Sequence, residues 1–294
     1  MKKLFVVICL LFAVISGYAN KIDSLTNATD VKAFVSPMLF NYYYSGVDSK
    51  WQVKNWLKTD LNNDNKTDLV VTETGGYQTF NFVVMAKSDT AYQLSQINYS
   101  TEGESIDVIR IDNKPYVVFH GLKETHDIRQ SIPRTDTLSY QFGSFVELNK
   151  NPAHYTIESI TCSSSWASPN GRPDNVLIIK KNKKAAYTVN RPHAGYILTK
   201  EKRSRNPQGD AGIYRSKIKT DELKDIYGLI NYIDIKKLNG KYASHYTDQN
   251  HYGITIKFAD NSLKTIADYG GRGTFGLQAI FSKLNHIIKT TNWR

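Results

Sequence analysis

Residues 252–277 read YGITIKFADNSLKTIADYGGRGTFGL, and this stretch decides the fold of the C-terminal half. Two runs rich in β-branched residues, YGITIKF and SLKTIADY, flank Asp260-Asn261, a dipeptide typical of tight hairpin turns. A helix is expected from about Thr274, because apolar residues recur with the helical period at Leu277, Ile280, Phe281, Leu284 and Ile288. An antiparallel hairpin followed by a helix predicts an α+β domain.

The segment before this hairpin extends the same domain. Three runs have strand composition: YTIESIT at 155–161, NVLIIKK at 175–181 and AAYTVN at 185–190. Residues 200–212 are too polar and too rich in Pro and Gly to pack, and they predict a loop. A helix follows, capped by Thr220, with apolar positions at Leu223, Ile226, Tyr227 and Ile230. Residues 153–294 therefore predict a second α+β domain with antiparallel strands and two helices that cover one side of the sheet.

The first half predicts one helix followed by an antiparallel meander. Thr29-Asp30 is the expected helix cap, and Pro37 predicts a kink or an early end. Six short runs rich in β-branched and aromatic residues follow, and Asp112-Asn113 separates the last two as a hairpin turn. They are WQVKNWL, DLVVTET, FNFVVMAK, YQLSQI, SIDVIRI and KPYVVFHG. We place this first α+β domain at residues 20–152, because the polar stretch from about Lys123 ends there.

The N-terminus has the pattern of a secretory signal peptide. Lys2 and Lys3 precede an apolar run from Leu4 to Ile15, and small residues lead to an expected cleavage after Ala19. This run is short for a membrane span, and no later stretch reaches the roughly 20 apolar residues that a spanning helix needs. The mature chain is expected to be secreted or periplasmic. It keeps Cys162 and loses Cys9, which leaves no intramolecular disulfide.

Positive charge is concentrated in one segment. The formal net charge of +11 falls to +9 when Lys2 and Lys3 are removed. Residues 180–205 carry much of the excess, and the partners this favours for an exported protein are anionic glycans or lipid headgroups rather than nucleic acid. The alternative is a solvated hairpin whose exposed positions happen to be lysine.

Residues 58–71, KTDLNNDNKTDLVV, carry the most specific chemical pattern in the chain. Counted from Asp60 as position 1, Asn62, Asp64 and Asp68 occupy positions 3, 5 and 9, while Lys66 at position 7 offers its backbone carbonyl. Asn65 occupies position 6, where the turn requires a left-handed residue, and Asn tolerates that conformation. The crowded carboxylates predict a structural Ca²⁺ site, with a metal-free hairpin as the alternative.

Two features distinguish this loop from an EF-hand: its flanks are expected to be strands, and position 12 is Val71 instead of glutamate. The D-x-N-x-D-x-x-x-D segment followed by an apolar strand resembles the calcium loop of FG-GAP and VCBS-type repeats. That resemblance covers the loop and implies the ion site. Because those propellers need several copies of the repeat and the chain has one, it does not imply a propeller.

Residues 271–276, GRGTFG, match the glycine pattern of dinucleotide-binding proteins. Only 18 residues follow Gly276, which leaves no room for the next parallel strand or its acidic residue, so we reject nicotinamide or flavin binding. Free backbone N–H groups at the helix start, beside Arg272, remain a candidate site for a carboxylate or phosphate. The simpler alternative is a turn that needs glycine.

No set of nucleophile, base and oxyanion donors can be assembled from the sequence, so an enzyme is not favoured. The chain has no G-x-S-x-G motif that could supply a nucleophile for His120, His126 and Asp127. Loop positions are expected for His245, Asp248 and His251. Cys162 follows a strand and is expected to be buried and inert. A hydrolase acting on an envelope or extracellular polymer remains the alternative.

Residues from about Ile157 to Trp293 resemble a bacterial domain family of unknown function found in secreted and lipid-anchored proteins. The matching features are ITC at 160–162, TDEL at 220–223, DYGG at 268–271, LQAIFSKLNHI at 277–287 and the terminal Thr-x-x-Trp at 290–293. Members carry a second cysteine soon after the first, which CSSSWAS lacks. The resemblance implies no activity, and the expected function is that of a non-catalytic binding protein with a calcium loop.

Overall fold

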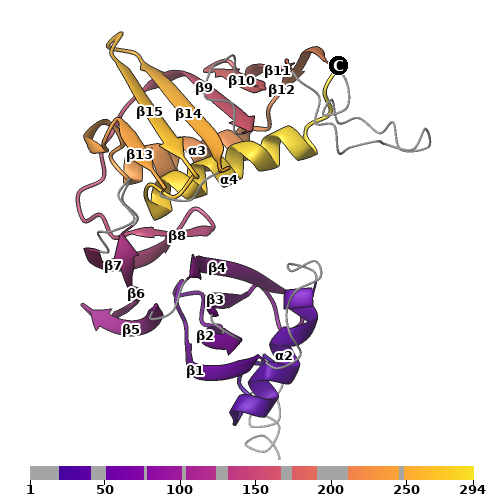
Figure 1. Cartoon of the computed structure of the whole chain (residues 1–294), viewed down its shortest axis with the longest axis vertical. Coiled ribbons are helices and arrows are strands. Elements are labelled where there is room, and N and C mark those ends of the chain that lie inside the picture. Colours follow the sequence, from indigo (N-terminus) through magenta and orange to yellow (C-terminus); the bar gives the residue numbers. More distant parts are fainter. Residues whose placement is uncertain are drawn as a thin grey trace, which may run out of the picture. The chain divides into compact units, whose positions relative to one another are not determined.

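The hairpin that decides the fold belongs to a seven-stranded sheet in the computed structural model of the chain (Figure 1). Strand β14 (Asn250–Phe258) pairs antiparallel with β15 (Leu263–Tyr269) on one side and with β9 (Ile157–Trp166) on the other. The sheet order is β12-β11-β10-β9-β14-β15-β13. Its remaining strands are β10 (Asn175–Lys180), β11 (Lys184–Val189), β12 (Gly212–Lys217) and β13 (Lys241–Ala243), of which β13 runs parallel to β15.

Two helices cover one face of this sheet, as the sequence predicted. Helix α3 (Thr220–Tyr232), the short 3-10 turn η3 (Ile235–Lys237) and helix α4 (Phe275–Thr290) bury their apolar residues in the same core as the sheet. Cys162, Leu177 and Ile254 lie opposite one another on neighbouring strands and belong to that core. The fold class is α+β.

The structure describes residues 20–40, 51–75, 78–100, 104–123, 132–166, 174–190, 211–244 and 248–294. The expected signal peptide, residues 1–19, lies outside them. The chain divides into two compact units, of which the first comprises 1–122 and 133–140 and the second 123–132 and 141–294. The domain limits expected from the sequence stay a prediction.

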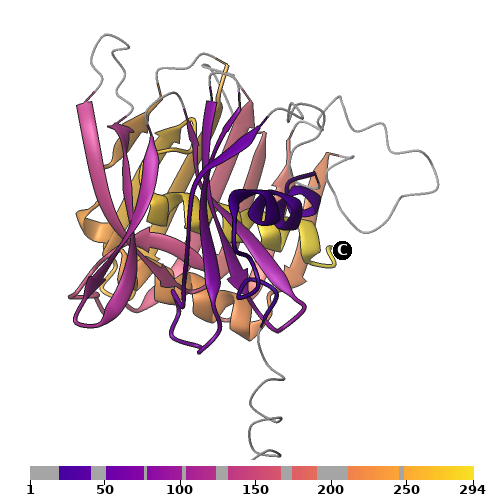
Figure 2. The same cartoon turned by 90° about the horizontal axis from the view of Figure 1, so that it is seen from below.

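The first unit contains helix α2 (Ala28–Phe40), the indigo helix of Figure 2, and a four-stranded antiparallel meander, labelled β1 to β4 in Figure 1. The meander follows chain order through β1 (Gln52–Thr59), β2 (Asp68–Gly75), β3 (Gln78–Ala86) and β4 (Tyr92–Ser100). Val31, Val35 and Leu39 of α2 pack with Leu69 and Val71 of β2 in a second core. That core is distinct from the core beneath α3 and α4.

A further sheet has the order β5-β6-β7-β8. Its strands are β5 (Ser105–Ile111), β6 (Lys114–Lys123), β7 (Ile132–Gln141) and β8 (Ser144–Glu147). The hairpin turns expected at Asp112-Asn113 and Asp260-Asn261 are confirmed: β5 pairs with β6 and β14 with β15, and Asp112, Asn113 and Asn261 have positive φ.

The predicted helix caps are partly wrong. Asn27, not Thr29-Asp30, caps α2, because its side-chain oxygen accepts the N–H of Asp30 at 3.0 Å. The helix also continues through Pro37 to Phe40. Thr220 is the first helical residue of α3 rather than its cap, and its hydroxyl accepts a hydrogen bond from the Lys183 ammonium at 2.7 Å. Helix α4 begins at Phe275, next to the expected start at about Thr274, and Thr274 caps it by accepting the N–H of Leu277 at 3.0 Å.

Candidate metal site

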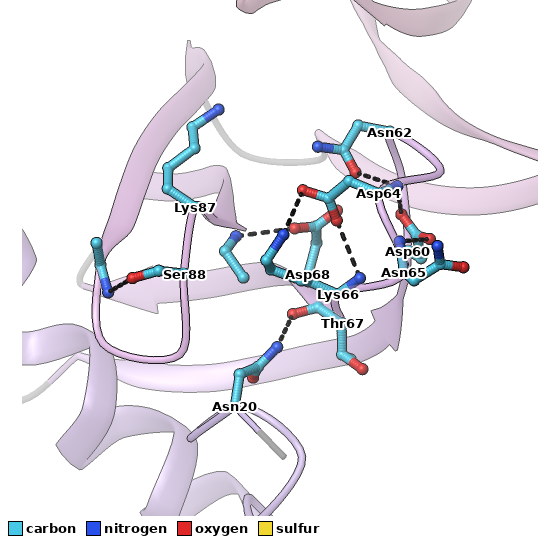
Figure 3. A network of polar contacts seen from close by, with 12 residues as sticks. Asn20, Asp60, Asn62, Asp64, Asn65, Lys66, Thr67, Asp68, Lys87 and Ser88 are labelled. Carbon is cyan, nitrogen blue, oxygen red and sulfur yellow. Dashed lines mark hydrogen bonds and ion pairs between the residues drawn. The ribbon is translucent and has the colours of Figure 1, made fainter. Parts of the chain in front are cut away.

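The loop between β1 and β2 is curled by its own side chains (Figure 3). The two carboxylate oxygens of Asp60 accept the backbone N–H groups of Asp64 at 3.1 Å and Asn65 at 2.8 Å. Asn63 and Asn65 have φ of 57° and 64°, so the left-handed conformation expected at Asn65 is confirmed. These bonds wrap the chain around Asp60, which is the backbone shape that an alternating set of oxygen ligands requires.

Asp64 projects from the middle of this loop toward Lys66. Its carboxylate accepts the Lys66 N–H at 2.9 Å and lies 3.4 Å from the Lys66 ammonium (Figure 3). Burial acts to raise the pKa of Asp64, but the hydrogen bonds from Lys66 and Asn62 and the Lys66 charge together hold it below its ordinary value. Asp64 is therefore a charged carboxylate at neutral pH.

Asp68 is fully buried at the start of β2. Its two oxygens accept the N–H groups of Leu61 at 2.8 Å and Ala86 at 2.9 Å. Burial, with a smaller contribution from the negative charges of Asp64 and Asp60, raises the pKa of Asp68 to about 6, although these two hydrogen bonds act to lower it. The charges of Asp64 and Asp60 thus disfavour the ionised form of Asp68, and the metal site itself stays a prediction.

Of the five residues proposed as ligands, four lie in the loop between β1 and β2, namely Asp60, Asn62, Asp64 and Lys66, and Asp68 is the first residue of β2. Within the described residues, no group of three or more His, Cys, Asp or Glu side chains is arranged as a ready metal centre. The chemistry of the loop nevertheless fits a hard cation, since each carboxylate that accepts N–H groups keeps further lone pairs for a metal. Asn20 fastens the end of the loop by donating to the carbonyl of Thr67 at 2.9 Å.

Carboxylates of the protein itself accept the backbone N–H groups of the glycine-rich stretch before α4 and of the first turn of that helix. Glu147 of β8 accepts the N–H groups of Phe275 at 2.7 Å and Gly276 at 2.9 Å, at the first turn of α4. Asp268 accepts those of Arg272 at 3.2 Å and Gly273 at 2.9 Å. The expectation of free N–H groups for an external anion is therefore wrong, because the helix start already binds Glu147.

Glu73 is the perturbed acid that the sequence did not single out. It is fully buried on β2, and neither of its carboxylate oxygens has a hydrogen-bond partner among the residues that the structure describes. Burial raises the pKa of Glu73 to about 7, and the positive charge of Lys32 only partly opposes this. The one sequence feature that indicates its burial is its position on β2: side chains alternate along a strand, so Glu73 points to the same face as the core residues Leu69 and Val71.

Glu73 and Asp68 do not form a catalytic pair. They are five residues apart on the same strand, so the alternation of side chains directs them to opposite faces. The Cys162 thiol is buried, as expected, and burial raises its pKa to about 12, which disfavours the nucleophilic thiolate. Asp248 lies in a turn with φ of 57° and His251 lies on β14, whereas His245 falls outside the described residues.

No described helix is long and apolar enough to cross a membrane. The described part of the basic segment, residues 180–190, contains the hairpin between β10 and β11; residues 191–205 lie outside the described residues. Comparison with curated proteins and with solved structures gives no match. Residues 173–288, which run from β10 almost to the end of α4, match the model of a domain of unknown function, DUF6438.

Proposed function

We propose that the chain is an extracytoplasmic, non-catalytic binding protein whose first unit is stabilised by Ca²⁺ in the loop of residues 60–68. The observation that carries the calcium site is the electrostatic state of Asp68. Its pKa of about 6 leaves it mostly ionised at neutral pH, although it is buried and faces the charges of Asp64 and Asp60. A divalent cation among these groups removes the repulsion that the folded loop otherwise carries.

The ligands are the side-chain oxygens of Asp60, Asn62, Asp64 and Asp68 and the backbone carbonyl of Lys66. They supply the oxygen donors that Ca²⁺ prefers, and water completes a set of six to eight. Binding requires the carboxylates to converge and the Lys66 ammonium to leave Asp64. A partly exposed ion pair of this kind contributes about 0–1 kcal/mol, so its loss is a small cost.

Two further points support the location and the non-catalytic role. The N-terminal sequence has the charged, apolar and small-residue order of a signal peptide. Calcium is millimolar outside cells, where modules of weak affinity are occupied. The buried acids with raised pKa values face opposite sides of β2 and so give no support to an acid–base pair.

The test is a thermal melting curve of the purified protein in millimolar Ca²⁺ and in chelator. With calcium about tenfold above the dissociation constant, we expect a gain of about 1.4 kcal/mol and a rise of about 5 °C in the melting temperature of the first unit. Asp64→Ala should abolish the response to calcium. Asp64→Asn should abolish most of it while keeping the oxygen that accepts the Lys66 N–H.

A matched control is Asp112→Asn, which removes an exposed carboxylate from a turn that also has positive φ. This variant should retain the full calcium response. Identical melting curves of the wild-type protein in calcium and in chelator would refute the calcium site.

A further inference from the structure

The seven-stranded sheet has a second face that α3 and α4 do not cover. Residues alternate along each strand, so the neighbours of the core positions Cys162, Leu177 and Ile254 point away from the helices. We call this side the open face. Across it Thr161 lies opposite Ile178 and Thr255, and Ala186 lies opposite Ile178 and Arg215.

The open face carries only positive charge at its strand positions. Six cations lie there: Lys180, Lys184, Arg215, Lys217, Lys241 and Lys257. All six are exposed, and no aspartate or glutamate alternates with them on the same side of the described strands. The adjacent Glu158, beside the register shift between β9 and β14, is already paired with Lys181 at 2.7 Å.

Four of these lysines form a row at one end of the face. Lys184 lies directly opposite Lys217. Ile179 pairs with Ala185, so Lys180, the next residue on β10, lies beside Lys184. Ser159 of β9 lies opposite both Lys180 and Lys257. The row therefore crosses from β12 to β14, four strand spacings, or about 19 Å. None of the four ammonium groups makes an ion pair or a hydrogen bond with any residue that the structure describes.

Like charges directly opposite on neighbouring strands destabilise a sheet, and here no acid offsets them. The folded protein therefore bears an electrostatic cost along this row, and an extended anion would relieve it. A small anion reaches only one or two of the four lysines, because neighbouring strands are about 4.8 Å apart. The spacing fits a polymer with repeated negative groups.

The side chains in the middle of the open face favour a polysaccharide over other anionic polymers. Thr161, Ser163, Thr255 and Thr265 provide hydroxyl groups there, suited to hydrogen bonds with sugar hydroxyl and acid groups. Nucleic-acid bases bind by stacking on exposed aromatic rings. On the described strands, the aromatic pair His251 and Tyr269 lies at the far end of the open face and not at its centre. The exposed apolar residues Ile213 and Leu263, 56% and 66% exposed, lie on β12 and β15, too far apart to form a membrane-inserting patch.

We propose that the open face binds an acidic polysaccharide, with the lysine row along its anionic groups and the hydroxyl-bearing strands β9, β14 and β15 against its sugars. The proposal rests on the binding role assigned above and is independent of the calcium loop.

The test is titration of the full protein with fluorescent dextran sulfate, with neutral dextran of the same length as the matched ligand control. We expect salt-sensitive binding of dextran sulfate and none of neutral dextran. The variant Lys184→Gln/Lys217→Gln/Lys257→Gln should bind about tenfold or more weakly at low salt. The control variant Lys219→Gln/Lys224→Gln/Lys289→Gln removes the same charge from exposed positions before and on α3 and α4, and should bind within about twofold of wild type.

Acetylation of lysines read by mass spectrometry gives a second measurement on the unchanged protein. Bound dextran sulfate should protect Lys180, Lys184, Lys217 and Lys257 and leave Lys219, Lys224 and Lys289 reactive. Equal weakening by the two triple variants, or equal protection of both sets, overturns the assignment to the open face. Tighter binding to phosphatidylglycerol vesicles or duplex DNA than to dextran sulfate overturns the polysaccharide. A failed calcium response would leave this result untouched.

Discussion

Glu73 places an ionisable group where the first unit cannot solvate its charge. The carboxylate is fully buried, has no hydrogen-bond partner in the described part of the chain and has a pKa of about 7, well above the ordinary 4.5. The folded state therefore binds this proton more tightly than the unfolded chain does. Stability from this group is full below the unfolded pKa and is lost as pH rises through about 7, a difference of about 3 kcal/mol.

Glu73→Gln should remove this pH dependence, because glutamine resembles the protonated acid and does not ionise. We expect the variant to be more stable than wild type at about pH 8, by up to about 3 kcal/mol, and similar at about pH 5. Urea unfolding at the two pH values measures the difference. Asp89→Asn, which removes an exposed acid after β3, is the control and should follow the wild-type curve. If Glu73→Gln and wild type lose stability in parallel, Glu73 is solvated and the prediction is wrong.

At this scale the sequence predicted local chemistry and missed long-range partners. The spacing of Asp60, Asp64 and Asp68 identified the loop, and the left-handed Asn65 followed from the turn that the spacing requires. The partner of the α4 N-terminus could not be predicted, because Glu147 lies 128 residues from Phe275 in the chain. Nothing within one segment indicates which distant carboxylate reaches a helix end.

Helix α4 depends at its start on that carboxylate. Glu147 accepts two N–H groups that the helix cannot satisfy itself, and its negative charge lies at the positive end of the helix dipole. Gly276 is needed there because a Cβ atom at this position would lie 2.5 Å from Cγ2 of Ile233. The start of α4, the end of β8 and the C-terminal end of α3 thus pack closely together at a single turn.

Glu147→Gln keeps one acceptor and removes the charge, so we expect it to lower the free energy of unfolding by about 1–2 kcal/mol. Glu147→Ala removes both acceptors and should cost about 2–3 kcal/mol. Chemical unfolding followed by circular dichroism measures both. Asp221→Asn, with an exposed carboxylate in the first turn of α3, is the control and should cost only about 0.5 kcal/mol. Equal losses in Glu147→Gln and Asp221→Asn would mean that Glu147 contributes only a general dipole effect.

The strands that the sequence predicted share a visible apolar or β-branched run, and those it missed do not. β7 reads IPRTDTLSYQ and β12 reads GIYRSK, in which polar residues hold most positions. β12 has no buried residue, since its exposed positions alternate with half-buried ones. β13 is only three residues long and pairs in parallel with β15. Such strands are stabilised by pairing with a neighbour already in place, which a single-segment pattern does not reveal.

For the molecule as a whole, the excess of positive charge could be predicted from composition, but its placement on the surface could not. Residues 180–205 were recognised as basic, yet Lys217 and Lys257 join Lys180 and Lys184 only through the strand order β12-β11-β10-β9-β14. The register also puts every one of these lysines on the side away from the helices. The lysine row therefore combines two residues of the basic segment with two residues from strands that are distant in the sequence.

The two units have separate hydrophobic cores, and Cys162 reports on only one of them. It lies on β9 in the core beneath α3 and α4, and its pKa of about 12 keeps it unreactive until the seven-stranded sheet opens. The proposed calcium loop belongs to the first unit, whose core shares no residue with that of the second. Calcium should therefore stabilise the first unit without slowing the alkylation of Cys162.

This prediction is measured by iodoacetamide labelling near the melting temperature, in calcium and in chelator, with Cys162 identified by its peptide mass. We expect equal labelling rates, while the same calcium raises the melting temperature of the first unit. Glu147→Ala serves as the positive control, because it weakens α4 and should speed labelling in both conditions. If calcium slows the labelling of Cys162, the two cores open together, and the ion stabilises one cooperative fold rather than one unit.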